Sequence, residues 1–234
     1  DAIDFLEDLN CPAYKIASFE ITDLELISKA AITQKPIILS TGIAEISDIK
    51  LAVETCKKVG NHNIILLKCT SAYPTPMEEV DLLSMQILGD EFDCLYGLSD
   101  HTIGNIVPLA SLALGSSMIE KHVMLDKNIE SADNFFSMTI LEFADMVKDL
   151  RLLQKALGKR KWNYNKSMKS GRKMSRSLFV TEDIEKNEIF TKNNLRSIRP
   201  GYGLHPKFLP EIIGKKASSS IKKGTPFDWD LVNK

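Results

Sequence analysis

Five short apolar segments in the first two-thirds of the chain are each followed by a segment with helical periodicity. These segments are 13–18 (AYKIAS), 36–40 (PIILS), 63–69 (NIILLKC), 94–99 (CLYGLS) and 118–123 (MIEKHV). Continuously apolar strands that alternate with amphipathic helices are typical of parallel βα units, because both faces of a parallel sheet are buried. The connections are too short for another kind of element. The sequence therefore predicts an α/β fold with about five parallel strands.

Polar or small residues follow the carboxyl end of every predicted strand. They are Ser18 and Glu20, then Ser40, Thr41 and Gly42, then Thr70, Ser71 and Tyr73, then Ser99, Asp100 and His101, and finally His122. The carboxyl ends of parallel strands carry the active site in a βα barrel, and in an open doubly wound sheet they do so at the switch point. Lys15 belongs to this set, because a lysine in an apolar strand is costly unless it faces an anion or a carboxylate.

Two histidines, His101 and His122, end consecutive predicted strands. If these strands are parallel neighbours, both imidazoles lie at the same end of the sheet, which is one way to build a divalent metal site. Two separately hydrogen-bonded histidines remain an equal alternative on these residues alone. The nearby serines, lysine and glycine suit a small phosphate or carboxylate. The sequence contains neither GxGxxG nor GxxxxGK[ST], so nucleotide binding of those types is not supported.

The charge balance changes near residue 168 and indicates a second domain. Residues 169–234 carry a net charge of +7, whereas the rest of the chain carries −8. We predict a first domain over 1–158, a linker over 159–173 and a small β domain over 174–234. The loop 196–207 holds Arg199, either as part of a structural turn or as an arginine delivered to a site elsewhere. The basic residues are dispersed and form no nucleic-acid motif, so a nucleic-acid partner is not favoured.

The remaining composition points to a cytoplasmic protein with no membrane partner. The four cysteines show no CxxC spacing, which favours reduced thiols over a disulfide framework. No apolar run approaches the roughly 18 to 20 residues of a membrane span. The acidic start, DAIDFLEDLN, lacks the pattern of a signal peptide.

Longer motifs resemble the sialic acid synthase family over essentially the whole chain. They are YKIAS-x-E, STG, L-x-CTS-x-YP, GLSDH and ALG-x-x-x-IEKH-x-x-LDK, followed by the tail domain. The sequences SFE, IEKHVMLDKNIES, RSLF, RPGYGLHPKF and IIGKKAS resemble the pseudaminic acid branch most closely. The resemblance implies a transferase that condenses phosphoenolpyruvate with an open-chain N-acetylated amino sugar and releases phosphate. The acceptor would be a 2,4-diacetamido-trideoxy sugar or an N-acetylmannosamine-like sugar. The neuraminate and legionaminate branches are the alternative.

The resemblance also implies an architecture and a set of site residues. The expected fold is a partial (β/α)8 TIM barrel, about its last five βα units, followed by an antifreeze-like (SAF) β-clip domain. Such chains form domain-exchanged homodimers in which the tail domain caps the partner's barrel. The implied roles are metal ligation by His101 and His122, for Mn²⁺ or else Mg²⁺ or Co²⁺; phosphoenolpyruvate binding by Lys15, Ser18, Ser40, Ser71 and Ser99; and sugar contacts or catalysis by Glu20, Tyr73, Asp133 and Arg199.

One departure from the family pattern limits these expectations. The family's first three βα units have no counterpart in this chain, and a closed barrel needs eight strands. Five strands leave two open sheet edges and an uncovered interior. We therefore expect a fragment of a longer product, or a chain whose missing part another chain supplies, with weak or no synthase activity alone. A non-catalytic sugar- or phosphate-binding remnant is a further alternative.

Overall fold

The computed structural model describes residues 1–159 and 161–233, which fall into two compact units, Asp1–Lys159 and Arg160–Lys234. Arg160, in the predicted linker, and Lys234, the last residue of the predicted tail domain, lie outside the described residues. No helix within the described ranges combines the length and the apolar character that crossing a membrane requires.

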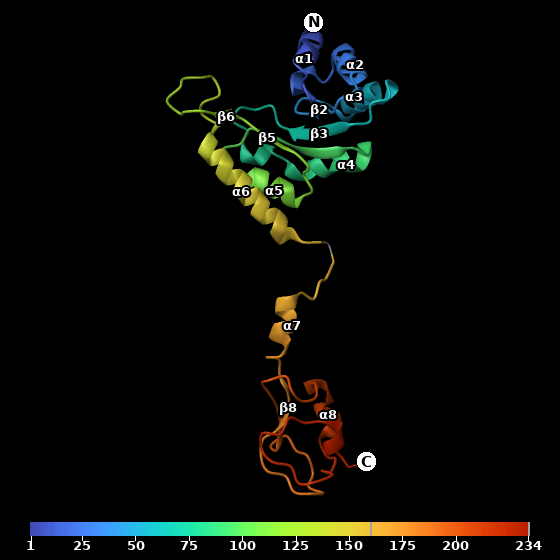
Figure 1. The fold of residues 1–234 in the computed structure, drawn as a ribbon, viewed down its shortest axis with the longest axis vertical. Coiled ribbons are helices and arrows are strands. Elements are labelled where there is room, and N and C mark those ends of the chain that lie inside the picture. Colours follow the sequence, from blue (N-terminus) through green and yellow to red (C-terminus); the bar gives the residue numbers. More distant parts are fainter. Residues whose placement is uncertain (160, 234) are drawn as a thin grey trace. The chain divides into compact units, whose positions relative to one another are not determined.

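The first unit is built on one five-stranded parallel sheet (Figure 1). Its strands lie side by side in chain order: β1 (Tyr14–Ile16), β2 (Ile37–Ser40), β3 (Ile64–Cys69), β4 (Leu95–Asp100) and β5 (Ile119–Lys121). All four neighbouring pairs are parallel. The predicted α/β architecture is confirmed, and the sheet is a partial barrel.

Helices connect the strands and cover one face of the sheet, which we call the outer face. They are α1 (Ala2–Asp8), α2 (Leu24–Ile32), α3 (Ile46–Lys58), α4 (Met85–Phe92), α5 (Ile106–Ala113) and α6 (Ile140–Leu157). Side chains cap the amino ends of α2 and α6: Asp23 accepts a hydrogen bond from Leu26 N–H, and Thr139 and Glu142 form a capping box. The outer face is dry, since Ile37, Leu39 and Leu66 are fully buried.

The opposite face of the sheet, the inner face, is only partly covered. Cross-strand partners share a face, so the register places Lys15, Ile38, Ile65 and Leu95 together on it. Leu95 is 59% exposed. An eight-stranded barrel fills its interior with side chains from all strands. The open inner face is therefore what five strands of such a barrel leave behind.

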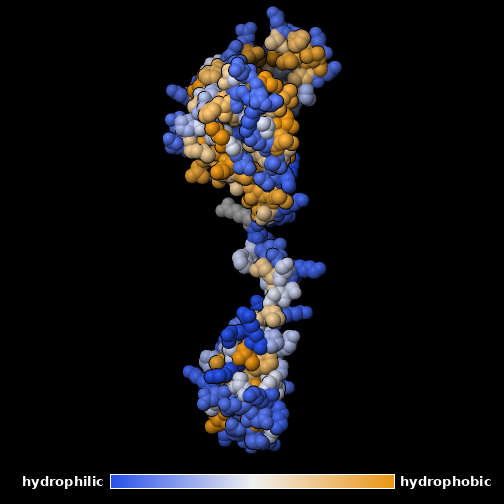
Figure 2. Space-filling model, turned by 90° about the vertical axis from the view of Figure 1, so that its left-hand side faces the viewer, coloured by the Kyte–Doolittle hydropathy of each residue, from blue (hydrophilic) through white to orange (hydrophobic). Residues whose placement is uncertain are grey.

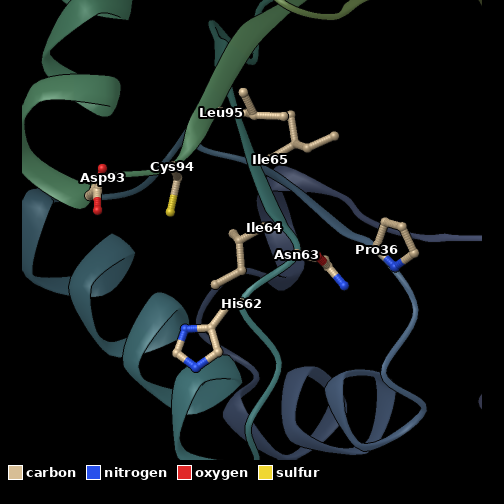
Figure 3. Close-up of a pocket in the computed structure, with 8 residues that line it drawn as sticks. All are labelled: Pro36, His62, Asn63, Ile64, Ile65, Asp93, Cys94 and Leu95. Carbon is tan, nitrogen blue, oxygen red and sulfur yellow. The ribbon is translucent and has the colours of Figure 1, made fainter.

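Apolar surface is exposed elsewhere on the first unit as well, and Figure 2 shows it as orange areas. At the amino ends of the strands, a pocket of about 490 Å³ opens at the sheet (Figure 3). It is lined by Pro36, His62, Asn63, Ile64, Ile65, Asp93, Cys94 and Leu95. Since the strands are parallel, this pocket lies at the end of the sheet opposite to His101 and His122.

The segment after β3 differs from the single helix that the apolar pattern predicts near 78–89. Two short 3-10 turns, Met77–Glu79 and Leu82–Ser84, precede α4, which begins at Met85. Asp81 lies between the turns and has a left-handed backbone with φ of 43°. A right-handed helix cannot continue through such a residue, so the helical pattern is divided there.

The second unit has a small core of its own. Strands β8 (Ser177–Val180) and β9 (Leu195–Ile198) pair antiparallel, and α8 (Leu209–Ile212) packs near them. The rings of Phe190 and Phe227 meet edge to face with centroids 4.9 Å apart, and both are fully buried. Isolated antiparallel β-bridges, such as Ile184 with Ile221 and Ala217 with Val232, complete this small β domain.

A short helix, α7 (Lys166–Arg172), lies within the segment predicted as a linker. Its start is fixed by Asn165, whose side-chain oxygen accepts a hydrogen bond from Met168 N–H at 2.9 Å. All residues of this helix are exposed. The polar composition that indicated a linker is thus compatible with a single capped helix that contributes nothing to a core.

Candidate active site at the carboxyl ends of the strands

The two histidines lie together, as their positions at the ends of neighbouring strands predict. Their ring centroids are 5.2 Å apart. His101 follows β4 directly and His122 follows β5 directly. The register pairs Asp100 with Lys121, which are the residues immediately before them. Parallel pairing therefore brings the two imidazoles to one point.

His101 is buried and held by the loop after β3. Its Nδ1–H donates to the Thr70 carbonyl at 3.1 Å, and its own carbonyl accepts from Thr75 N–H at 3.1 Å. Burial lowers the pKa of His101 below its ordinary value. The ring is therefore neutral at physiological pH, and the lone pair of Nε2 is available to a ligand.

His122 is held by the loop that follows β5. Its Nδ1 lies 3.4 Å from Asp133 Oδ2, and its carbonyl accepts from Met138 N–H at 3.0 Å. The short strands β6 (Val123–Met124) and β7 (Met138–Thr139) pair in parallel and close this loop. Asp133 is thus brought back beside the histidine although ten residues lie between them in sequence.

Two aromatic rings form a wall around the histidines. Tyr73 packs at 4.3 Å from His101, and Phe136 packs at 4.9 Å from His122, with 5.6 Å between the two aromatic rings. Burial raises the pKa of Tyr73, so its hydroxyl remains protonated. Tyr73 was expected at the site. Phe136 was not, because nothing in its sequence context distinguishes it from the exposed Phe135 beside it.

A serine cluster lies at the carboxyl ends of the first three strands. Ser18 Oγ and Ser71 Oγ are 2.6 Å apart. Within the part of the chain that the structure describes, Ser40 Oγ is the only buried side-chain oxygen or nitrogen without a hydrogen-bond partner. An unpaired buried hydroxyl is costly unless a ligand satisfies it. These three serines therefore suit an anion that accepts hydrogen bonds.

Lys15 and Ser99 both bind the carboxylate of Glu120. Lys15 Nζ lies 3.2 Å from Glu120 Oε1, and Ser99 Oγ donates to the same oxygen at 2.7 Å. Lys15 is on β1 and Glu120 is on β5, the two edge strands of the sheet. The sheet is thus curved enough for its edges to meet through side chains across the inner face. Lys15 thus faces a carboxylate, as a lysine in an apolar strand was expected to do. That carboxylate belongs to Glu120, for which the sequence indicated no role.

Two of the expected site residues, Glu20 and Arg199, lie in other surroundings. Glu20 is exposed, and its Oε2 accepts a hydrogen bond from Ala17 N–H at 3.0 Å, which caps its own 3-10 turn, Ser18–Glu20. Arg199 belongs to the second unit, in the turn after β9. Their roles remain those that the resemblance implies.

Gly42 allows the serine cluster to pack closely. A Cβ at this position would lie 2.3 Å from Ser71 Oγ and 2.9 Å from Cys69 Sγ. Gly42→Ala should displace Ser71 and weaken the binding of inorganic phosphate by roughly tenfold, since overpacking costs about 1–3 kcal/mol. Titration calorimetry with phosphate measures this. Gly171→Ala, where a Cβ meets nothing within 4 Å, is the matched control, and equal affinities for the two variants would contradict the expectation.

The histidine pair fits a divalent metal ion as a two-imidazole donor set. Rings that bind one ion at about 2.1 Å have centroids about 5 Å apart at a near-tetrahedral angle, and the observed separation is 5.2 Å. The second nitrogens of His101 and His122 already engage Thr70 and Asp133, which is how ligating imidazoles are commonly oriented. Among the described residues, no group of three or more His, Cys, Asp or Glu could hold a metal, so water and substrate oxygens would complete the coordination.

The fold and the site together define a βα-barrel protein whose ligand site lies at the carboxyl ends of its strands. Comparison with known families is consistent with this class: residues 1–162 match the NeuB family and residues 175–233 match the SAF domain. The chain belongs to the NeuB family. The resemblance read from the motifs is thereby confirmed.

Individual relatives extend this finding. The chain is 50% identical over its full length to pseudaminic acid synthase of Helicobacter pylori, of which it covers 69%, and 45% identical over 95% of its length to pseudaminic acid synthase of Campylobacter jejuni, of which it covers 65%. The crystal structure of spore coat polysaccharide biosynthesis protein SpsE of Bacillus subtilis matches the whole chain with a TM-score of 0.63 at 32% identity, over 71% of its own length. This chain thus spans about two-thirds of such proteins.

Proposed function

We propose that this chain provides the catalytic carboxyl-terminal part of a pseudaminic acid synthase. The proposed reaction joins C3 of phosphoenolpyruvate to the aldehyde carbon of an open-chain 2,4-diacetamido-trideoxy sugar, and water is consumed as phosphate leaves. The observation that carries the proposal is that a serine cluster suited to an anion and a histidine pair lie at one end of a NeuB-family sheet.

Phosphoenolpyruvate would bind at the serine cluster and at Lys15. Ser40 Oγ has no partner in the described chain and is free to donate to an anionic oxygen. Ser18 and Ser71 share one hydrogen bond, so one hydroxyl proton remains available for a ligand. Lys15 and Ser99 would exchange the Glu120 carboxylate for the phosphate or carboxylate of the substrate.

The acceptor sugar would lie between the serine cluster and the aromatic wall. Tyr73 presents a protonated hydroxyl, and the Asp133 carboxylate accepts hydrogen bonds from sugar hydroxyls or amides. Arg199 would reach the sugar from the tail domain of a second copy in a domain-exchanged homodimer. Glu20 would release its contact with Ala17 N–H and then orient the sugar or carry a proton.

His101 and His122 would hold a divalent ion, for which manganese is the first choice and magnesium or cobalt are alternatives. When bound, the ion supplies Lewis acidity at the aldehyde oxygen of the sugar. In the proposed reaction the enol carbon would attack the aldehyde carbon, water would add at C2 of the former phosphoenolpyruvate, and phosphate would leave from that carbon. Since phosphoenolpyruvate is an intracellular metabolite, we place the reaction in the cytoplasm, in agreement with four free thiols.

The proposal is tested by joining the unmatched part of the Helicobacter pylori enzyme to Asp1 and measuring phosphate release with each candidate sugar. We expect turnover with the 2,4-diacetamido-trideoxy sugar and little with N-acetylmannosamine. Preference for N-acetylmannosamine or for the legionaminate precursor would assign the chain to another branch of the family. Binding of phosphoenolpyruvate without turnover of any sugar would support the non-catalytic alternative.

A further inference from the structure

Asp100 and Lys121 form a buried ion pair directly behind the two histidines. Lys121 Nζ lies 2.6 Å from Asp100 Oδ2, and the two side chains are only 1% and 2% exposed. The pair joins β4 to β5, since the register makes the two residues cross-strand partners. Each is the residue immediately before a histidine, so its side chain points to the outer face while the imidazole points to the inner face.

The pair also fixes the turn that carries His101. Asp100 Oδ1 accepts from Thr102 N–H at 3.1 Å, and Oδ2 accepts from Thr102 Oγ1 at 3.1 Å. Lys121 Nζ donates to the Thr102 carbonyl in addition to Asp100. One ammonium group on the strand of His122 therefore binds the residues on both sides of His101.

Stability alone is a weak reason for such a pair. Desolvating two charges offsets most of their attraction, and well-packed apolar residues often do as well or better. An apolar pair would lack directional contacts, because dispersion contacts fix neither the register nor the spacing of two strand ends. The four hydrogen bonds of this ammonium and this carboxylate fix both. The arrangement is thus suited to positioning.

We propose that Asp100 and Lys121 are positioning residues that set the separation of the His101 and His122 rings. The inference deepens the proposed function, since that spacing is what lets both imidazoles bind one ion. Neither residue touches substrate or metal. Residues that orient metal ligands typically change metal affinity by 10- to 100-fold when they are replaced.

The test compares the wild-type chain with the double variant Asp100→Asn/Lys121→Met, which removes both charges and leaves no unpaired buried charge. Asp4→Asn/Lys29→Met is the matched control, because Lys29 and Asp4 form an exposed pair at 2.5 Å between α1 and α2. The first measurement is the nuclear Overhauser effect between the ring protons of His101 and His122 without metal. We expect it in the wild type and the control, and its loss in the double variant.

The second measurement is binding of Co²⁺, followed by its visible spectrum, and of Mn²⁺, followed by electron paramagnetic resonance. We expect the double variant to bind 10- to 100-fold more weakly with an altered cobalt spectrum, while circular dichroism stays unchanged. An unchanged ring contact and an unchanged spectrum in the double variant would overturn the positioning role. If the ring contact is lost in the double variant as expected, but the wild-type chain binds neither ion, the positioning role is upheld and the proposed metal site is contradicted. The single variant Lys121→Met should unfold at a lower denaturant concentration than the wild type, because it leaves the Asp100 carboxylate buried and unpaired.

Discussion

Replacing His122 by alanine in the completed enzyme is expected to lower kcat/KM by roughly a thousandfold. The Lewis acidity that the histidine pair makes possible is worth several kcal/mol, and each 1.36 kcal/mol is a factor of ten in rate. His101→Ala should cost a similar factor, and the double variant little more, because either imidazole alone holds the ion poorly. The measurement is phosphate release at saturating Mn²⁺, with bound manganese determined in parallel.

His62→Ala is the matched control for these variants. His62 lines the pocket at the amino ends of the strands (Figure 3), and in a parallel sheet this end is opposite to the carboxyl ends where His101 and His122 lie. It should leave both turnover and manganese content unchanged. If His122→Ala binds manganese as tightly as the wild type and turns over at a similar rate, the two histidines are not a metal site.

The second large effect concerns completion of the barrel. The 234-residue chain alone is expected to release phosphate at less than about one hundredth of the rate of the form joined to the unmatched part of the Helicobacter pylori synthase. We expect the strands that would close the barrel to carry further substrate contacts, and misplacing a reactant by about 1 Å can already cost a hundredfold in rate. Open strand edges and exposed inner-face residues such as Leu95 should also make the isolated chain self-associate.

Phosphate release by both forms, with sedimentation velocity on each, checks this expectation. The joined form carrying His101→Ala controls for activity contributed by the added segment alone, and it should be nearly inactive. Comparable turnover by the 234-residue chain and the joined form would contradict this expectation.

Much of the fold can be predicted from the spacing of apolar residues along the chain. Apolar runs such as IILLKC give β3 because only a strand buried on both faces is apolar throughout. The convergence of His101 and His122 follows from parallel pairing alone. What periodicity cannot reveal is the curvature of the sheet, and the contact between Lys15 and Glu120 depends on it.

Other parts of the site depend on loop conformations that no periodic pattern encodes. Phe136 reaches the histidines because β6 and β7 close their loop, although each of these strands is only two residues long. The division of the predicted 78–89 helix depends on the backbone of one residue, Asp81. The ion pair between Asp100 and Lys121 forms because the register between β4 and β5 makes them cross-strand partners. The sequence does not show this register, although each residue directly precedes a histidine.

The contact between Lys15 and Glu120 also affects which anions the proposed site can select. An incoming anion meets an ammonium group that already has a counter-ion within 3.2 Å, so it gains only the difference between its own attraction and that of Glu120. Chloride or acetate offers no more charge than the carboxylate it would displace. A ligand with two or more negative charges attracts Lys15 more strongly than the Glu120 carboxylate does. The Glu120 carboxylate therefore favours the binding of multiply charged anions over singly charged ones.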